Sequence, residues 1–182
     1  SRAKFAVEYP ASFMLVASMN PCPCGYYNHP DKECVCAPGV VQKYLNKISG
    51  PLLDRIDLHV EVTPVPFSEL SKERLSEKSE QIRQRVVTAR EIQTERYKDG
   101  DAVFCNAQMT TKQLRTICKL TDDGTQLLKT AMDRLGLSAR AYDRILKVAR
   151  TIADLAASEH IKTEHLAEAI QYRSLDREGW AG

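Results

Sequence analysis

The chain has 182 residues, of which 43% are hydrophobic and 27% charged, with 8 glycines and 8 prolines. This composition excludes collagen-like, low-complexity and disordered polypeptides and indicates a folded protein with a hydrophobic core. Lys and Arg number 26 against 24 Asp and Glu, so any surface that binds nucleic acid must be a local patch. No apolar run approaches the roughly 20 residues that cross a bilayer, and no signal-peptide pattern is present. We therefore expect a cytoplasmic protein without a membrane partner.

Two segments near the start of the chain have the pattern of strands. Residues 13–19 form a near-continuous apolar run, which is typical of a parallel strand buried on both faces. Residues 56–62 alternate strictly, which predicts an edge strand with its apolar residues inward and its polar residues outward. A short helix is predicted over about 40–48. We therefore expect residues 1–66 to be part of an α/β core with a parallel sheet, interrupted by a Cys-rich loop at 22–36.

The rest of the chain is expected to be helical, which makes the predicted fold class α+β or α/β with an all-α bundle at its end. A charged helix with a thin apolar stripe is predicted over 68–97, within a linker at 67–102. Residues 103–182 are expected to form the bundle. Its helix boundaries are predicted from a Thr110 and Gln113 capping box, from caps at Thr121, Ser138 and Thr163, and from a stop at Gly136.

Four of the six cysteines lie close together in the Cys-rich loop, as the pairs Cys22 and Cys24, and Cys34 and Cys36. Four thiolates can satisfy one Zn²⁺, and the loop between the pairs is long enough to fold back. Each pair has only one intervening residue, where structural zinc sites usually have two or more. His29 can replace one sulfur, and reduced free thiols or a labile redox site are the alternatives to structural zinc.

Three polar residues stand at positions that suit nucleotide chemistry. Asn20 directly follows the predicted buried strand, at the sheet edge where open α/β folds bind ligands, although Asn20-Pro21 also fits a simple turn. Arg55 precedes the predicted edge strand and can reach a neighbouring subunit as an arginine finger, or be only a solvated charge. Arg140 lies in the first turn after the Ser138 cap, where a cation opposes the helix dipole; a basic helix surface is the alternative.

Neither a G-x-x-x-x-G-K-[ST] phosphate loop nor a strand ending in adjacent carboxylates is present. We therefore expect the chain by itself neither to bind nor to hydrolyse ATP. No Ser/His/Asp or Cys/His hydrolase arrangement is evident either. Because the sequence starts at Ser1 without an initiator methionine, we expect it to be a piece of a longer protein.

Three stretches closely resemble the bacterial magnesium-chelatase-like AAA+ ATPases of the ComM competence type. They are YPASFMLVASMNPCPCG at 9–25, ISGPLLDRIDLHV at 48–60 and LSARAYDRIL at 137–146. The resemblance implies a larger protein with a Lon-protease-like domain and an AAA+ core whose phosphate loop and Mg²⁺-binding acids precede Ser1. The present chain would then contain the end of that core and its helical lid.

By position in the family motifs, Asn20 corresponds to the first sensor, Arg55 to a trans-acting arginine finger and Arg140 to the second sensor, acting in cis from the lid. Arg144, one turn after Arg140, is expected to assist nucleotide binding. The resemblance implies ATP and Mg²⁺ as cofactors of the longer protein and a homohexamer as its assembly. The competence-type members are associated with DNA branch migration during recombination of incoming DNA, in natural transformation.

Two other functions remain open from the sequence. One is an ATPase that assists magnesium insertion into a tetrapyrrole, as magnesium chelatases do. The other is a non-catalytic, zinc-bound module that binds nucleic acid through basic residues of the linker helix such as Arg83, Arg85 and Arg90. The small net charge argues against this last possibility as a stand-alone function.

Overall fold

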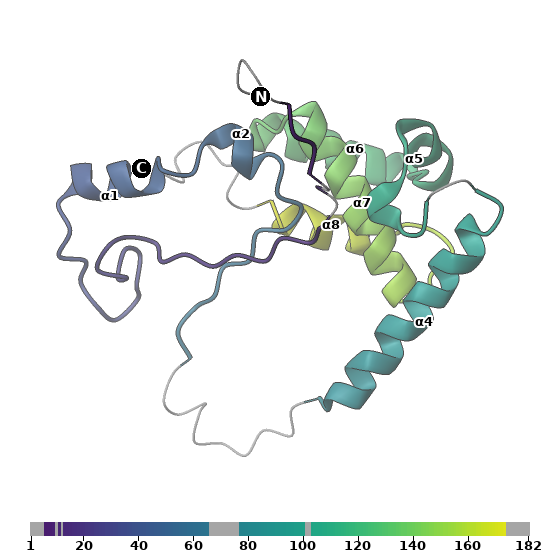
Figure 1. Ribbon diagram of the computed structural model, residues 1–182, viewed down its shortest axis with the longest axis horizontal. Helices are drawn as coiled ribbons and strands as arrows, with labels where there is room; N and C mark the ends of the chain where they lie inside the picture. The colour runs from purple at the N-terminus through teal and green to yellow at the C-terminus, as the bar shows by residue number, and fades with distance from the viewer. Residues whose placement is uncertain (1–5, 10, 12, 66–76, 101–102, 174–182) are drawn as a thin grey trace. The chain divides into compact units, whose positions relative to one another are not determined.

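The computed structural model describes residues 6–9, 11, 13–65, 77–100 and 103–173 (Figure 1). The chain divides into two compact units, Ser1–Leu45 and Asn46–Gly182. Each unit is described by itself.

The first unit contains the Cys-rich loop and a single helix among its described residues. Helix α1, Pro38–Leu45, buries Val41 and Leu45 one helical turn apart. The helix predicted over 40–48 is therefore confirmed, with its start two residues earlier and its end three residues earlier.

The predicted strand at 13–19 is not confirmed. The segment is extended but belongs to no sheet, and Phe13 and Val16 are 75% and 83% exposed. A buried parallel strand needs hydrogen-bonded strands at its sides, and within the described part of the chain no strand is present to pair with it. The parallel sheet of the fold-class prediction is accordingly not confirmed.

The predicted edge strand at 56–62 is also not confirmed, and the expected separation into a buried apolar face and an exposed polar face is absent from this segment. Leu58, Val60 and Val62 are 48%, 66% and 88% exposed, whereas His59 is buried. The His59 backbone N–H donates to the Tyr172 carbonyl at 2.8 Å, so this segment is held against the end of a helix rather than in a sheet.

The second unit is a helical bundle, as predicted for the C-terminal part of the chain. In chain order its elements are α2 (Gly50–Leu53), α4 (Ser79–Tyr97), the 3₁₀ helix η1 (Asn106–Gln108), α5 (Thr111–Ile117), α6 (Asp122–Leu135), α7 (Ala139–Leu155) and α8 (Thr163–Gln171). No helix in the described ranges is long and apolar enough to cross a membrane.

Most of the predicted helix boundaries are confirmed. Thr110 and Gln113 form the reciprocal capping box at the start of α5, and the Thr121 hydroxyl accepts the Gly124 N–H at 3.2 Å at the start of α6. Gly136 ends α6 with φ at 60°, a left-handed conformation that glycine adopts without a Cβ clash.

The cap of α8 differs from the prediction by one residue. Thr163 is the first helical residue and Lys162 is the cap. The ring Nδ1 of His165 accepts the Lys162 N–H at 3.1 Å, which is the bond that the third helical residue makes to the cap residue in a capping box.

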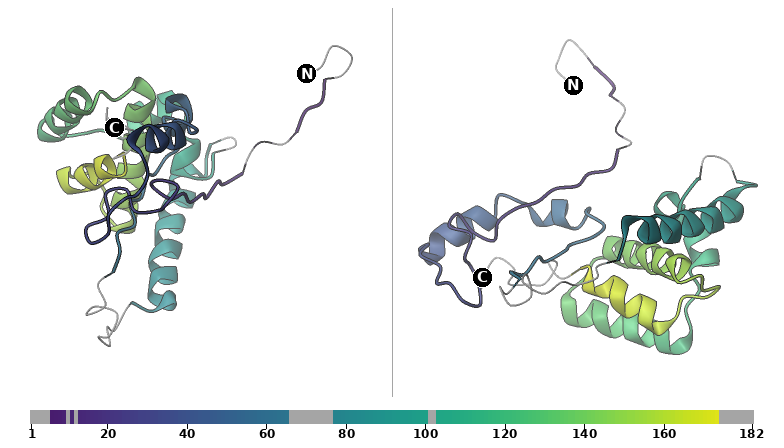
Figure 2. Two further views of the ribbon diagram at one scale, coloured as in Figure 1. Left: turned by 90° about the vertical axis from the view of Figure 1, so that its left-hand side faces the viewer. Right: turned by 90° about the horizontal axis from the view of Figure 1, so that it is seen from below.

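Helix α7 is the centre of the bundle. It contacts α4, α5, η1 and α8, while α8 also packs against α6; Figure 2 shows these helices lying beside one another. The inner face of α7 is apolar and buried, and consists of Ile145, Leu146, Ala149 and Ala153. Cys118 lies in the same core, and burial raises the pKa of its thiol to about 11.

Helix α4 begins at Ser79, later than the predicted helix start at 68; residues 66–76 lie outside the described ranges. Its C-terminal half packs on the bundle through Ala89, Gln93 and Tyr97, and its N-terminal half runs away from the bundle in Figure 1. Ile82, predicted to be part of the apolar stripe, is accordingly 43% exposed.

A buried ion-pair network joins α4 to α7. The Arg96 guanidinium donates to both carboxylate oxygens of Asp154, at 2.7 and 2.5 Å, and Asn106 donates to Asp154 at 2.8 Å. Arg150, also buried, donates to Asp154 at 3.1 Å and to the carbonyls of Ser158 and Glu159. Each charge thus has a partner, which is the condition for burying ionic groups in a core.

Candidate functional site

The four cysteines of the loop at 22–36 are brought together in the first unit. The Cys22 Sγ lies 3.3 Å from the Cys24 Sγ and 3.7 Å from the Cys34 Sγ, and Cys24 and Cys34 are 3.5 Å apart. With Cys36 included, the four sulfur atoms lie within 4.8 Å of one another. A tetrahedron with Zn–S bonds of about 2.3 Å places its sulfur atoms about 3.8 Å apart. The four side chains therefore form a cluster that can hold one metal ion.

A tight turn and a backbone hydrogen bond to sulfur shape the chain around the first cysteine pair, which has a single intervening residue. The Gly25 N–H donates to the Cys22 carbonyl at 3.0 Å, and Gly25 has a φ of 83°, a conformation that favours glycine. The chain thus reverses directly after Cys24. The Tyr27 N–H then donates to the Cys22 sulfur at 3.3 Å, a contact that stabilises thiolate ligands.

The sulfur environments differ in their preference for a negative charge. A hydrogen bond from the Tyr26 backbone lowers the pKa of Cys24 to about 6. The Cys36 backbone favours the Cys34 thiolate, but burial and the neighbouring thiols Cys24 and Cys22 outweigh it and raise the pKa of Cys34 to about 12. Four adjacent thiolates repel one another, so a cation among them would favour the fully deprotonated cluster.

His29 has another task in the loop. Its Nδ1 accepts the N–H groups of Asp31 and Lys32 at 3.0 and 3.1 Å, and its ring stands edge-on to that of Tyr26. The group of candidate metal ligands consists of the four cysteines and does not include His29. His29 instead shapes the loop that connects the two pairs.

Asn20 lies in the same unit, exposed and in extended chain. Because the strand predicted before it is not formed, its position does not have the sheet-edge setting from which its sensor role was inferred. That role stays a prediction.

The Asp54 carboxylate connects the segment that carries Arg55 to the helix that carries Arg140, within the second unit. Asp54, which directly precedes Arg55, accepts the Ser138 hydroxyl at 2.5 Å, and its Oδ2 lies 3.6 Å from the Arg140 Nη1. Arg55 itself is exposed and donates to the Pro51 carbonyl at 2.5 Å. Two of the predicted catalytic residues thus occupy one surface, close to the start of α7.

A second ion pair lies one helical turn further along α7. The Arg144 guanidinium donates to the Asp57 carboxylate. Partial burial, together with the nearby Arg173 charge, lowers the pKa of Arg144. Asp54 and Asp57 were not predicted as site residues, because their partners Arg140 and Arg144 lie far away in the sequence.

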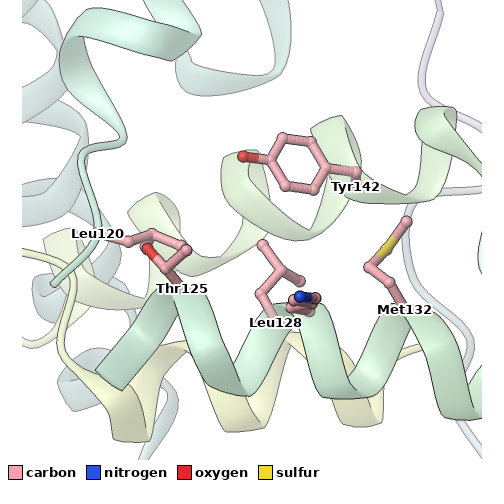
Figure 3. A pocket seen from close by; sticks show the side chains of 6 residues that line it. Leu120, Thr125, Leu128, Met132 and Tyr142 are labelled. Carbon is pink, nitrogen blue, oxygen red and sulfur yellow. The ribbon is translucent and has the colours of Figure 1, made fainter. Parts of the chain in front are cut away.

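A small hollow between α6 and α7 is the other concave feature that bears on function. Figure 3 shows Tyr142 of α7 above Leu128 and Met132 of α6, with Leu120 at one end. Its lining is mainly apolar, with Lys129 as its one charged residue, and it includes none of the predicted catalytic residues. Tyr142, expected in the core, is 41% exposed because it covers this hollow.

Two family models match successive parts of the chain. The family described as magnesium chelatase, subunit ChlI C-terminal, matches residues 76–173, and that described as magnesium chelatase, subunit ChlI, matches residues 1–70. The chain belongs to the magnesium chelatase family. The helical bundle is its C-terminal domain, and the resemblance inferred from the three sequence stretches is confirmed.

Individual relatives in the magnesium chelatase family match nearly the whole chain. Competence protein ComM of Haemophilus influenzae is 44% identical over 178 residues, which cover 97% of this chain and 34% of that protein. The uncharacterized protein YifB of Escherichia coli is 43% identical over the same length, again 34% of that protein. An uncharacterized protein of Mycobacterium tuberculosis is 38% identical over 165 residues. The chain spans about a third of the length of these relatives.

Proposed function

We propose that the chain is part of a longer AAA+ ATPase and supplies arginines to the ATP site at a subunit interface. The observation that carries this proposal is the position of the exposed Arg55 directly after Asp54, whose carboxylate lies 3.6 Å from Arg140. A γ-phosphoryl group in transfer develops negative charge on its oxygens, and fixed guanidinium groups stabilise that charge. Arg55 acts as the arginine finger, and Arg140, with Arg144 beside it, binds nucleotide phosphate from the lid.

The exposed apolar run at 13–19 supports the longer protein. A contiguous stretch with Phe13 and Val16 largely exposed is unusual at a solvent surface. In the proposed AAA+ core the run is covered by neighbouring strands, and Asn20 then stands at the end of a buried strand and orients the attacking water. ATP and Mg²⁺ bind where the remainder of that core supplies the phosphate loop.

We further propose a homohexamer that moves DNA, with branch migration during natural transformation as its task. The support is the relative named competence protein ComM, with 44% identity. Magnesium insertion into a tetrapyrrole is the second candidate, favoured by the magnesium chelatase family description. Stimulation of ATP hydrolysis by branched DNA rather than by a tetrapyrrole and its partner subunits separates the two.

The metal of the cysteine cluster is proposed to be a structural Zn²⁺. All four positions are filled by protein sulfur, which leaves no site open for water or substrate, as in structural zinc sites. The ion would hold the two ends of the loop together through Cys22, Cys24, Cys34 and Cys36. The alternatives of free thiols and a redox site predict a chain without metal.

Replacement of Arg55 tests the proposed ATPase role. In the longer protein, Arg55→Ala should retain ATP binding and lose hydrolysis by about a thousandfold or more, the scale of arginine-finger effects. Arg115→Ala is the matched control, because Arg115 is an exposed arginine on α5, away from Asp54. Hydrolysis at the wild-type rate in Arg55→Ala would contradict the proposal.

A further inference from the structure

We propose that Asp54 and Asp57 are positioning residues that clamp the finger segment, residues 53–59, onto the helical bundle, so that the lid itself presents Arg55. This inference rests on the proposed ATPase function for the role of Arg55. The clamp itself is a statement about contacts of this chain and can be tested without nucleotide.

Each of the two acids contacts one of two arginines on α7. Arg140 and Arg144 are four residues apart, so they lie one above the other on one face of α7. Asp54 lies 3.6 Å from Arg140, and Asp57 accepts a hydrogen bond from Arg144. The finger segment therefore runs along the first two turns of α7 with one ion pair in each turn.

The Ser138 hydroxyl ties the finger segment to the start of the helix. Its oxygen accepts the Ala141 N–H at 3.1 Å as the cap of α7, and its hydrogen is donated to Asp54 at 2.5 Å. The Ser138 hydroxyl thus donates one hydrogen bond and accepts another. The residue that starts the lid helix also fixes the carboxylate next to Arg55.

The other end of the finger segment is held by the end of α8. The His59 N–H donates to the Tyr172 carbonyl at 2.8 Å, and the Arg173 guanidinium donates to the Ile56 carbonyl. His59 is buried, and its Nε2 lies 3.2 Å from the Leu53 carbonyl, which closes the segment into a compact loop. An exposed ion pair alone is weak. The ion pairs of Asp54 and Asp57 and these backbone contacts together hold the finger segment on the bundle.

Arg55 is left on the outer side of this clamp. It is exposed, and no carboxylate in the described residues forms an ion pair with it, whereas Arg140 and Arg144 are paired with Asp54 and Asp57. Its guanidinium is thus available to an anion outside the chain. A lid movement in one subunit would carry this arginine toward or away from its neighbour.

The clamp is tested by amide hydrogen exchange at His59 in the 182-residue chain. The double variant Asp54→Ala and Asp57→Ala should exchange the His59 amide about tenfold faster or more, because local opening limits exchange of a buried, bonded N–H. The charge swap Asp57→Arg with Arg144→Asp should restore protection relative to Asp57→Arg alone. Glu61→Gln, a nearby exposed acid, is the control and should leave exchange unchanged.

The positioning role is tested by ATP hydrolysis in the longer protein. The double variant should lower kcat and leave the ATP dissociation constant unchanged, and the charge swap should recover kcat. The proposal is overturned if His59 exchange is unaltered, or if kcat is unaltered while Arg55→Ala abolishes hydrolysis. If Arg55→Ala itself hydrolyses ATP normally, the proposed ATPase role fails, and the exchange result still decides whether the clamp exists.

Discussion

The Asp54 carboxylate lies 3.6 Å from the Arg140 guanidinium, which joins the residue before Arg55 to the first turn of α7. This contact gives a reason for a cation at a helix N-terminus, where the helix dipole opposes it. Asp54 offsets the unfavourable position. Under the proposed function, Arg140 would exchange this carboxylate for a phosphate when nucleotide binds.

That exchange predicts a nucleotide-affinity defect for Arg140. In the longer protein, Arg140→Ala should weaken ATP binding as well as hydrolysis, because a lid contact to phosphate serves the ground state as well as the transition state. Titration with a fluorescent ATP analogue measures the dissociation constant. Wild-type affinity in Arg140→Ala would remove it from the nucleotide site.

The cysteine cluster predicts a definite metal content. Elemental analysis of protein purified without chelator should find close to one zinc per chain, as four sulfur ligands satisfy one tetrahedral ion. Cys24→Ser should lose the metal. Cys105→Ser, outside the cluster, should keep it. Metal-free protein with all four cluster thiols open to alkylation would show that no zinc site exists.

The buried network predicts a large loss of stability for Asp154→Asn. Removal of this charge leaves the buried Arg150 guanidinium without its anion, and breaking one side of a buried ion pair costs about 3–5 kcal/mol. Urea unfolding followed by circular dichroism measures the change. Asp143→Asn, on the same helix but outside the network, should unfold close to the wild-type midpoint.

The same carboxylate predicts how stability responds to acid. Burial disfavours the Asp154 carboxylate, but hydrogen bonds from Arg96 and Asn106 outweigh burial and lower its pKa below the ordinary value. The stability that the ionised Asp154 contributes is therefore fully present above the pKa of an aspartate in the unfolded chain, about 3.9. This stability is lost as the pH falls through the lower pKa that Asp154 has in the folded protein. Urea midpoints measured from pH 6 to pH 2 should fall in this window by less in Asp154→Asn than in the wild type.

Local signals predicted the helical part of the fold well. Thr110, Thr121, Ser138 and Gly136 act through atoms within a few residues of themselves, so the sequence alone specifies these helix ends. The inner face of α7 follows equally from its helical periodicity. The buried pair of Arg150 and Asp154 was missed because a charged residue on an apolar face becomes acceptable only through a distant partner, here Arg96 on α4.

The strand predictions failed for a related reason. Residues 13–19 have a strand pattern, but a strand exists only when another lies beside it, and the described residues provide none. At 56–62 the alternation indicated a sheet edge, whereas the contacts of His59 with Tyr172 and of Asp57 with Arg144 determine how the segment lies. The cysteine cluster was predictable because all four ligands lie within one short loop.

The central claim, that Arg55 acts on the ATP site of a neighbouring subunit, is tested most directly by mixing inactive proteins. Arg55→Ala subunits should be combined with subunits of a phosphate-loop mutant, each in the longer protein and each inactive by itself. Arg55 in trans predicts that hydrolysis returns, because some interfaces then pair an intact nucleotide site with an intact arginine. No recovery of hydrolysis in mixtures shown to contain mixed hexamers would contradict the claim.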